Sequence, residues 1–336
     1  MQTTTSRKAS LGALSALLFL SLLPKLASAQ TPSSALLVLN KEDNSLSIVD
    51  PATLKTVAQI STGEGPHEIV ASDDGKLAFV GNYGARTPGS TLSVIDLVGR
   101  KELRRVDLGA LRRPHGLAFA DGKLWLTAEQ NKLVARYDPA ANQLDGLIGI
   151  GQNGTHMLVF SKDHTLLFTS NIGSDSITLL QRGADFNGWT LTNIPVGKGP
   201  EGADISPDAR EFWAANSGDG TVSIIDVAAK KVTQTLDLHT NHSNRLKFTA
   251  DGKLVLISDP GSNNLVIVDA ASRKELKRFN VGRQPEGILI PPDGARAYIA
   301  LAGEKTVAVI DLKTLEVTAR LAVGNGPDGL AWAVRQ

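Results

Sequence analysis

One feature constrains this chain more than any other: a segment of about forty residues recurs seven times along it. Each copy opens with a proline, serine or threonine, which is followed by a polar residue, an apolar run and a turn. The opening positions are Pro66, Pro114, Thr155, Pro200, Ser243, Pro285 and Pro327, at spacings of 48, 41, 45, 43, 42 and 42 residues. A repeat of this kind is one supersecondary unit that buries its apolar faces against its neighbours.

Four short stretches rich in apolar and β-branched residues lie within each copy. The second stretch ends in a polar residue, as in residues 77–82, and the third ends in aspartate, as in residues 222–226. Pairs such as Asp74-Gly75 and Asp251-Gly252 mark the turn between the first and second stretches. No apolar period of 3.6 residues runs through the copies, which argues against a helical solenoid. We therefore predict an all-β fold: a seven-bladed β-propeller with four-stranded antiparallel blades.

The two ends of the repeat region complement each other. Residues 35–61 hold only three predicted strands, and residues 327–333 supply a fourth. We expect the C-terminal strand to join the N-terminal blade and close the ring, so that residues 30–336 form a single propeller domain.

The first 29 residues have the pattern of a signal peptide. Arg7 and Lys8 precede an apolar run over residues 11–23, and Ala27-Ser28-Ala29 offers small residues for cleavage before Gln30. The apolar run is shorter than the ~20 residues that a membrane-spanning helix needs. We expect a periplasmic or secreted protein with no stable membrane insertion after cleavage.

Composition removes several classes of function. The chain has no cysteine, which excludes disulfides, thiolate metal sites and cysteine nucleophiles. Its net charge of +1 falls to −2 when the three basic residues of the signal segment are removed, so no basic field favours nucleic acid. A phosphate-binding glycine loop and a Gly-x-Ser-x-Gly nucleophile elbow are both absent from the sequence. We expect a monomer.

Residues 215–226, ANSGDGTVSIID, resemble the repeat of the YVTN family of β-propellers, which is similar to the lactonase-type seven-bladed propellers. The resemblance covers nearly all of residues 35–334. It implies the propeller fold but assigns no catalytic residue, because the repeated residues of this family are mainly structural. Departures from the repeat mark where function could lie: Glu129 and Leu301 replace the usual asparagine, and Arg245 replaces the usual glycine.

Propeller geometry predicts two rings of side chains at one end of the central axis, because each second strand ends beside the start of the first strand. The first ring follows the opening positions and comprises His67, His115, His156, Glu201, Asn244, Glu286 and Asp328. The second ring ends the second strands and comprises Asn40, Asn82, Glu129, Asn171, Asn216, Asp259 and Leu301. We interpret the four asparagines of the second ring as turn residues that bond through their side chains.

The first ring carries the functional hypotheses, because turn chemistry does not require imidazole at three equivalent positions. One hypothesis is a divalent metal ion, with zinc or copper favoured, on the ligands His67, His115, His156 and Glu201. Another is a small polar or anionic ligand in contact with Arg113, Glu129, Asn244, Arg245, Glu286 and Asp328. The alternative without function is that these side chains form a solvated polar rim that binds no ligand.

These hypotheses leave three classes of function open. The first is a binding protein that holds a metal ion or a small ligand at the mouth of the axis. The second is an enzyme, such as a metal-assisted lyase or lactone hydrolase, with candidate catalytic groups His115, His156, Glu201 and Arg245. The third is a scaffold that binds a protein partner through its rim.

Overall fold

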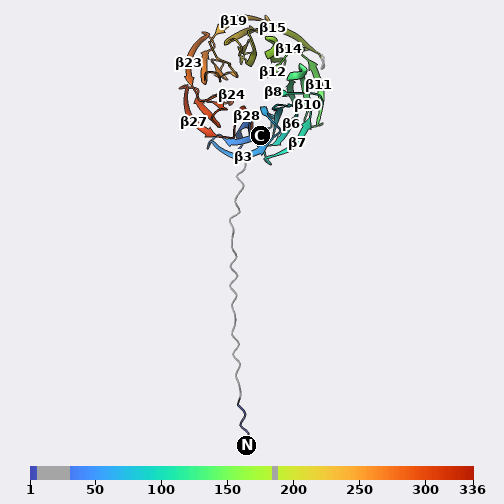
Figure 1. The fold of residues 1–336 in the computed structure, drawn as a ribbon, viewed down its shortest axis with the longest axis vertical. Coiled ribbons are helices and arrows are strands. Elements are labelled where there is room, and N and C mark those ends of the chain that lie inside the picture. The colour runs from blue at the N-terminus through green and yellow to red at the C-terminus, as the bar shows by residue number, and fades with distance from the viewer. Residues whose placement is uncertain (6–30, 184–187) are drawn as a thin grey trace. The chain divides into compact units, whose positions relative to one another are not determined.

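The computed structural model describes residues 1–5, 31–183 and 188–336, so most of the predicted signal peptide lies outside the described residues. Within the described ranges, no helix has both the length and the apolar character that crossing a membrane requires. Residues Thr31–Gln336 form one compact unit of seven four-stranded sheets. Figure 1 shows these sheets as blades around a common axis. The prediction of a seven-bladed β-propeller is confirmed.

Every blade has an inner, a second, a third and an outer strand, in that order. Blade 1 comprises β28 (Pro327–Val334), β1 (Ser34–Asn40), β2 (Ser45–Asp50) and β3 (Lys55–Ser61). Blade 2 comprises β4 (Pro66–Ala71), β5 (Leu77–Gly84), β6 (Pro88–Asp96) and β7 (Lys101–Asp107). Blade 3 comprises β8 (Pro114–Ala120), β9 (Lys123–Ala128), β10 (Leu133–Asp138) and β11 (Gln143–Gly149). Blade 4 comprises β12 (Thr155–Phe160), β13 (Leu166–Asn171), β14 (Ser176–Arg182) and β15 (Trp189–Pro195).

The remaining blades repeat this order. Blade 5 comprises β16 (Pro200–Ile205), β17 (Glu211–Asn216), β18 (Thr221–Asp226) and β19 (Lys231–Asp237). Blade 6 comprises β20 (Leu246–Phe248), β21 (Leu254–Asp259), β22 (Asn264–Asp269) and β23 (Lys274–Asn280). Blade 7 comprises β24 (Pro285–Leu289), β25 (Arg296–Leu301), β26 (Thr306–Asp311) and β27 (Glu316–Ala322). Two short 3-10 helices, η1 (Glu129–Asn131) and η2 (Ile172–Ser174), follow β9 and β13.

The repeat predicts where the inner strands begin. Six of the seven start at their opening residue, and only β20 starts later, at Leu246. The backbone before β20 still pairs with β21, because Asn244 N–H donates to the Ser258 carbonyl at 2.9 Å and Ser258 N–H donates to the Arg245 carbonyl at 3.0 Å. The ring closes as predicted, since β28 pairs antiparallel with β1.

Apolar side chains fill the spaces between neighbouring blades. The seven core clusters each draw residues from two adjacent blades. Between blades 4 and 5, the rings of Phe168 and Phe212 stack with centroids 4.2 Å apart. Between blades 7 and 1, Tyr298 and Leu36 belong to the cluster that seals the ring. Because both faces of the second and third strands are covered, these strands have continuous apolar sequences.

The aspartate that ends a third strand caps the turn that follows it. The Asp50 carboxylate accepts a hydrogen bond from Ala52 N–H at 2.9 Å, and the Asp226 carboxylate accepts one from Ala229 N–H at 2.7 Å. The backbone hydrogen bond from Ala52 lowers the pKa of Asp50 because it favours the ionised form. The repeated aspartates therefore build the blades, and residues that differ between blades are the candidates for a functional site.

Candidate functional site

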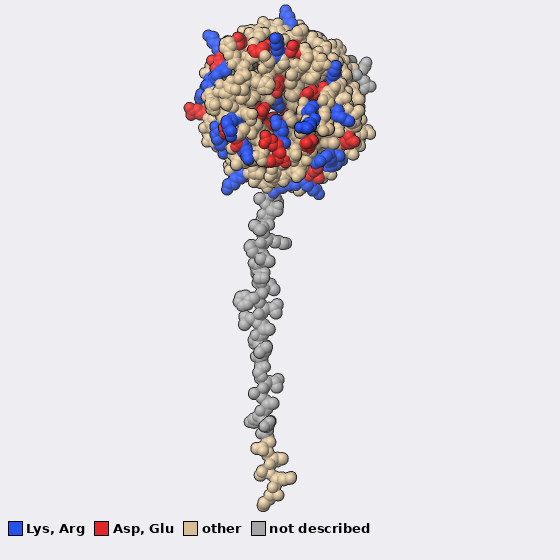
Figure 2. All heavy atoms as spheres, viewed as in Figure 1, with Lys and Arg blue, Asp and Glu red and all other residues tan. Residues whose placement is uncertain are grey.

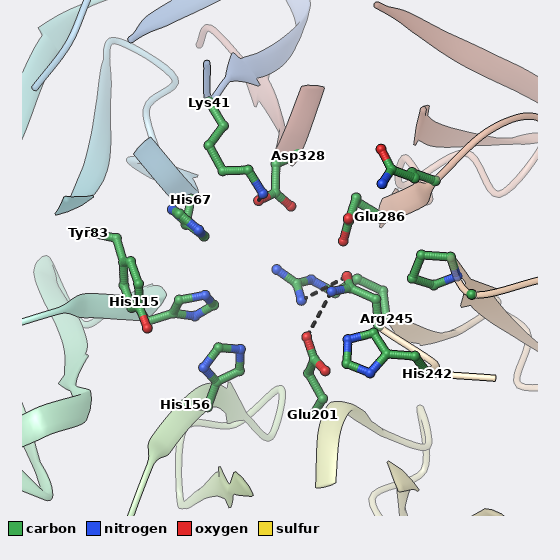
Figure 3. Close-up of a pocket in the computed structure, with 14 residues that line it drawn as sticks. Lys41, His67, Tyr83, His115, His156, Glu201, His242, Arg245, Glu286 and Asp328 are labelled. Atoms are coloured by element: carbon green, nitrogen blue, oxygen red, sulfur yellow. Dashed lines mark hydrogen bonds and ion pairs between the residues drawn. The ribbon is translucent and has the colours of Figure 1, made fainter. Parts of the chain in front are cut away.

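The first ring converges on one cavity at an end of the propeller axis. All seven of its members, from His67 to Asp328, line this axial cavity, whose volume is about 450 Å³. Figure 3 shows His115, His156, Glu201 and Glu286 pointing toward a common centre. Figure 2 shows acidic and basic groups gathered around the hollow in the middle of this face.

Close packing of neighbouring inner strands brings the ring together. The residue after the first-ring position is glycine in four blades: Gly116, Gly202, Gly287 and Gly329. A Cβ atom on Gly116 would lie 2.6 Å from the carbonyl oxygen of His156, and one on Gly329 would lie 2.3 Å from the carbonyl oxygen of His67. A side chain would push adjacent blades apart, so glycine keeps the ring narrow enough to form one cavity.

The asparagines of the second ring are turn residues, as predicted. The Asn82 side chain accepts a hydrogen bond from Gly63 N–H and donates to the hydroxyls of Thr91 and Ser93, each at 3.0 Å. Asn216 donates to the equivalent hydroxyls of Thr221 and Ser223 at 2.8 and 3.0 Å. These bonds tie the second strand to the third, and they leave the asparagine side chains outside the lining of the axial cavity.

Two lining residues that the sequence analysis missed directly follow second-ring asparagines. Lys41 follows Asn40 and Tyr83 follows Asn82, so both emerge at the same mouth. Lys41 Nζ lies 3.2 Å from Asp328 Oδ2, and this carboxylate raises the pKa of Lys41. Burial acts to raise the pKa of Asp328, but the charges of Lys41 and His67 outweigh it and lower that pKa. Lys41 and Tyr83 could have been predicted from the sequence, because each directly follows a second-ring residue and therefore lies at the same mouth.

The three first-ring histidines form a cluster. The rings of His115 and His156 stack with centroids 3.6 Å apart, and the His67 ring lies 5.6 Å from that of His115. His115 is 2% exposed, and its Nδ1 has no hydrogen-bond partner among the described residues. Burial lowers the pKa of His115 well below its ordinary value, and neighbouring His156 and His67 add to this effect. His115 is therefore a neutral imidazole with an unused nitrogen.

Two predicted ligand contacts, Glu129 and Arg113, are not among the residues that line the cavity. The Glu129 carboxylate lies 3.0 Å from His156 Nδ1 and accepts a hydrogen bond from the Tyr83 hydroxyl at 3.1 Å. Burial and the Glu129 charge raise the pKa of Tyr83 to about 12. The Arg113 guanidinium covers the Tyr83 ring at 4.4 Å from its centroid. Both residues thus support the cavity wall from behind.

Arg245 reaches across the propeller axis. Its guanidinium forms an ion pair with Glu68, which belongs to blade 2, and the two side chains are only 7% and 13% exposed. Arg245 also donates to the Asn244 side-chain oxygen at 3.2 Å, while the Asn244 amide donates to Glu201 at 2.8 Å. Figure 3 shows the Arg245 guanidinium near the centre of the ring.

Glu68 and Arg245, which we call the floor pair, occupy the same repeat position, one residue along the inner strand from the first ring. Four other blades have glycine there, and the fifth has Met157. Arg245 lines the axial cavity, and Glu68 holds its guanidinium in place. Arg245 was predicted as a departure from glycine, whereas Glu68 was not predicted, although its opposite charge at the same repeat position was an available signal.

Two carboxylates in the cavity, Glu201 and Glu286, form no ion pair among the described residues. Burial raises the pKa of Glu201, whose carboxylate accepts the hydrogen bond from Asn244. Burial and the nearby Asp328 charge raise the pKa of Glu286 to about 7. Glu286 can therefore exchange a proton near neutral pH, which suits it to binding a donor or acting as a base.

The four predicted metal ligands all line the axial cavity, yet they are not arranged as a coordination shell. In residues 1–5, 31–183 and 188–336, no group of three or more His, Cys, Asp or Glu has a geometry that could hold a metal ion. The His115 ring stacks on that of His156, and His156 Nδ1 contacts Glu129. The metal site remains a prediction.

A model of a family described as YNCE-like beta-propeller matches residues 9–333. Antigen Lp49 of Leptospira interrogans is 22% identical over 229 residues, which cover 62% of this chain and 49% of that protein. The chain therefore spans about half the length of this curated relative.

Two solved structures share the fold. Periplasmic gluconolactonase of Pseudomonas aeruginosa has a TM-score of 0.70 at 20% identity, covering 90% of this chain and 99% of that one. A chain of hydrazine synthase from Kuenenia stuttgartiensis has a TM-score of 0.67 at 21% identity, covering 80% of this chain and 89% of that one. At these identities the similarity shows the fold alone.

Proposed function

The chain belongs to the YNCE-like β-propeller family, and we propose that it binds a small polar ligand in the axial cavity. The observation that carries this proposal is the convergence of all seven first-ring residues on one cavity of about 450 Å³. This volume lies within the range of small-molecule sites, roughly 300–1,000 Å³. A purely structural role for the first ring is less well supported, because its position holds His, Glu, Asn and Asp in different blades. The blade fold therefore requires no particular side chain there.

Thermal denaturation with a panel of sugar acids, lactones, amines and divalent metal ions tests this proposal. A ligand at 100 times its Kd stabilises the folded chain by about 2.7 kcal/mol, which raises the melting temperature measurably. His115→Gln should abolish the shift, whereas His239→Gln should retain it, because the His239 side chain is 84% exposed and lies outside the lining of the cavity. Equal shifts in both variants would contradict binding in the axial cavity.

Hydrolysis of a small lactone is a second candidate function. The Glu286 carboxylate, with its pKa of about 7, lies in the same cavity as the Arg245 guanidinium. In this proposal, Glu286 takes a proton from water as the water oxygen attacks the lactone carbonyl carbon. Arg245 N–H groups stabilise the oxyanion, and the ring C–O bond then breaks as the alkoxide leaving group receives a proton. The likeness to a periplasmic gluconolactonase favours this class of substrate.

The assay for this second function follows D-glucono-1,5-lactone opening above its spontaneous rate, with and without a chelator. Glu286→Gln should remove the enzymatic rate, and an unchanged rate in that variant would contradict the mechanism. Loss of activity with chelator, restored by zinc or copper, would instead support a metal on His67, His115, His156 and Glu201.

We also propose that the protein acts outside the cytoplasm. The support is the signal-like pattern of residues 1–29, together with the likeness to a periplasmic protein. N-terminal sequencing of the protein from its own cells tests this. A mature chain that begins at Gln30 supports export, and a retained Met1 contradicts it.

A further inference from the structure

The axial cavity is lined by more carboxylates than permanent cations, and this imbalance indicates which ligand charge it favours. Two permanent cations line the cavity, and each already has an acidic partner. Lys41 pairs with Asp328 at 3.2 Å, and Arg245 pairs with Glu68 below it. Each permanent cation of the cavity is therefore held in an ion pair with an acidic residue of the protein.

Two carboxylates, Glu201 and Glu286, form no ion pair with a described residue. Glu201 accepts a hydrogen bond from the neutral Asn244 amide at 2.8 Å and another from the Ser217 hydroxyl. The charges of Lys41 and Arg245 act on Glu286 from a distance, yet burial and the Asp328 charge outweigh them and raise its pKa. Both carboxylates project into the cavity from blades 5 and 7 (Figure 3). A buried carboxylate without a counter-charge is costly, so the empty cavity favours an added proton or an added cation.

A second and independent observation comes from the opposite wall. The His115 ring lines the cavity and points into it (Figure 3), while its Nδ1 is shielded from solvent and has no hydrogen-bond partner among the described residues. A neutral imidazole nitrogen can accept a hydrogen bond or bind a metal ion. The cavity therefore presents two carboxylates on one side and a neutral imidazole ring on the other, and its two permanent cations are held in ion pairs.

We propose that the ligand of the axial cavity carries a positive charge, which Glu201 and Glu286 bind from one side while the neutral His115 ring faces it from the other. This proposal rests on the proposed function and names the ligand class of the same site. The chemistry argued for is an organic ammonium compound, because no group of three His, Asp or Glu among the described residues has a geometry that could hold a metal ion. A divalent metal ion is the alternative outcome of the test. The proposal disfavours the anionic ligand that Arg245 and Asp328 were expected to contact, because the Arg245 charge is used by Glu68.

A matched series of probes tests the charge directly on the unaltered protein. D-Glucamine, D-glucitol and D-gluconate share a six-carbon polyol and differ in carrying a positive, no or a negative charge; zinc chloride is the metal arm. We expect D-glucamine to bind at least about tenfold more tightly than D-glucitol and D-gluconate in calorimetric titrations, a difference of about 1.4 kcal/mol. D-Glucamine binding assigns an organic ammonium ligand, and zinc binding assigns a metal ion.

Variants locate the effect. Glu286→Gln and Glu201→Gln should each weaken cation binding about tenfold or more, whereas Glu316→Gln, on the outer strand β27, should not change it. Tighter binding of D-gluconate or D-glucitol than of either cation, lost in His115→Gln, would overturn this inference but leave the proposed function standing. Binding of no probe at all would count against both.

Discussion

Disruption of the floor pair tests how the cavity is built. Glu68→Ala leaves the Arg245 guanidinium without its partner, and Arg245→Ala leaves the Glu68 carboxylate alone, at sites only 7% and 13% exposed. Removing one partner of a buried ion pair costs about 3–5 kcal/mol, because an uncompensated charge stays buried. Removing both partners leaves no such charge. We therefore expect the double variant to lose less stability than the sum of the single variants, with a coupling energy of about 1–3 kcal/mol.

Thermal denaturation followed by circular dichroism measures the stability of the two single variants and the double variant. For a domain of this size, 1 kcal/mol shifts the melting temperature by about 2 °C, so each single variant should melt about 6–10 °C lower. Arg210→Ala is the control, because Arg210 and Asp208 form a pair whose side chains are 85% and 59% exposed. Such a surface pair contributes at most about 1 kcal/mol. Strictly additive losses in the Glu68 and Arg245 variants would refute the cross-axis pair.

Three further predictions concern the ring and its mouth. Deleting residues 327–336 removes β28 from blade 1 and should lower the melting temperature sharply, so an unchanged value would refute closure. Gly329→Ala should destabilise the fold by about 1–3 kcal/mol in denaturant titrations, because its Cβ would lie 2.3 Å from the His67 carbonyl oxygen; no loss would mean that the blades adjust freely. Burial raises the pKa of Glu286 from 4.5 to about 7, so the folded chain holds this proton more tightly than the unfolded chain. The stabilisation from this proton is complete below pH 4.5 and is lost as the pH rises to about 7. In Glu286→Gln, the free energy of unfolding should therefore change less with pH across that window. The same pH dependence in the variant and the unaltered protein would contradict the raised pKa.

The fold was predictable because every blade repeats the same local chemistry. Aspartates such as Asp226 end third strands and cap the next turn, while Asn216 ties the second strand to the third. A pattern that recurs seven times averages out the ambiguity of any single strand. Position in the repeat was also enough to place the first ring at one mouth.

The chemistry of the site was less predictable, because it depends on contacts between distant blades. Glu68 and Arg245 are 177 residues apart, and only the closed ring brings them together. Glu129 and Arg113 lie at the correct mouth, yet they face Tyr83 rather than the cavity. Which side chains point inward depends on packing at each blade, which the repeat does not encode.

The most direct test of the central claim is a crystal structure of the protein soaked with D-glucamine and, separately, with zinc chloride. We expect difference density for D-glucamine in the axial cavity, between His115 and the carboxylates of Glu201 and Glu286. An empty axial cavity in crystals whose density shows the probe bound elsewhere on the propeller would contradict it.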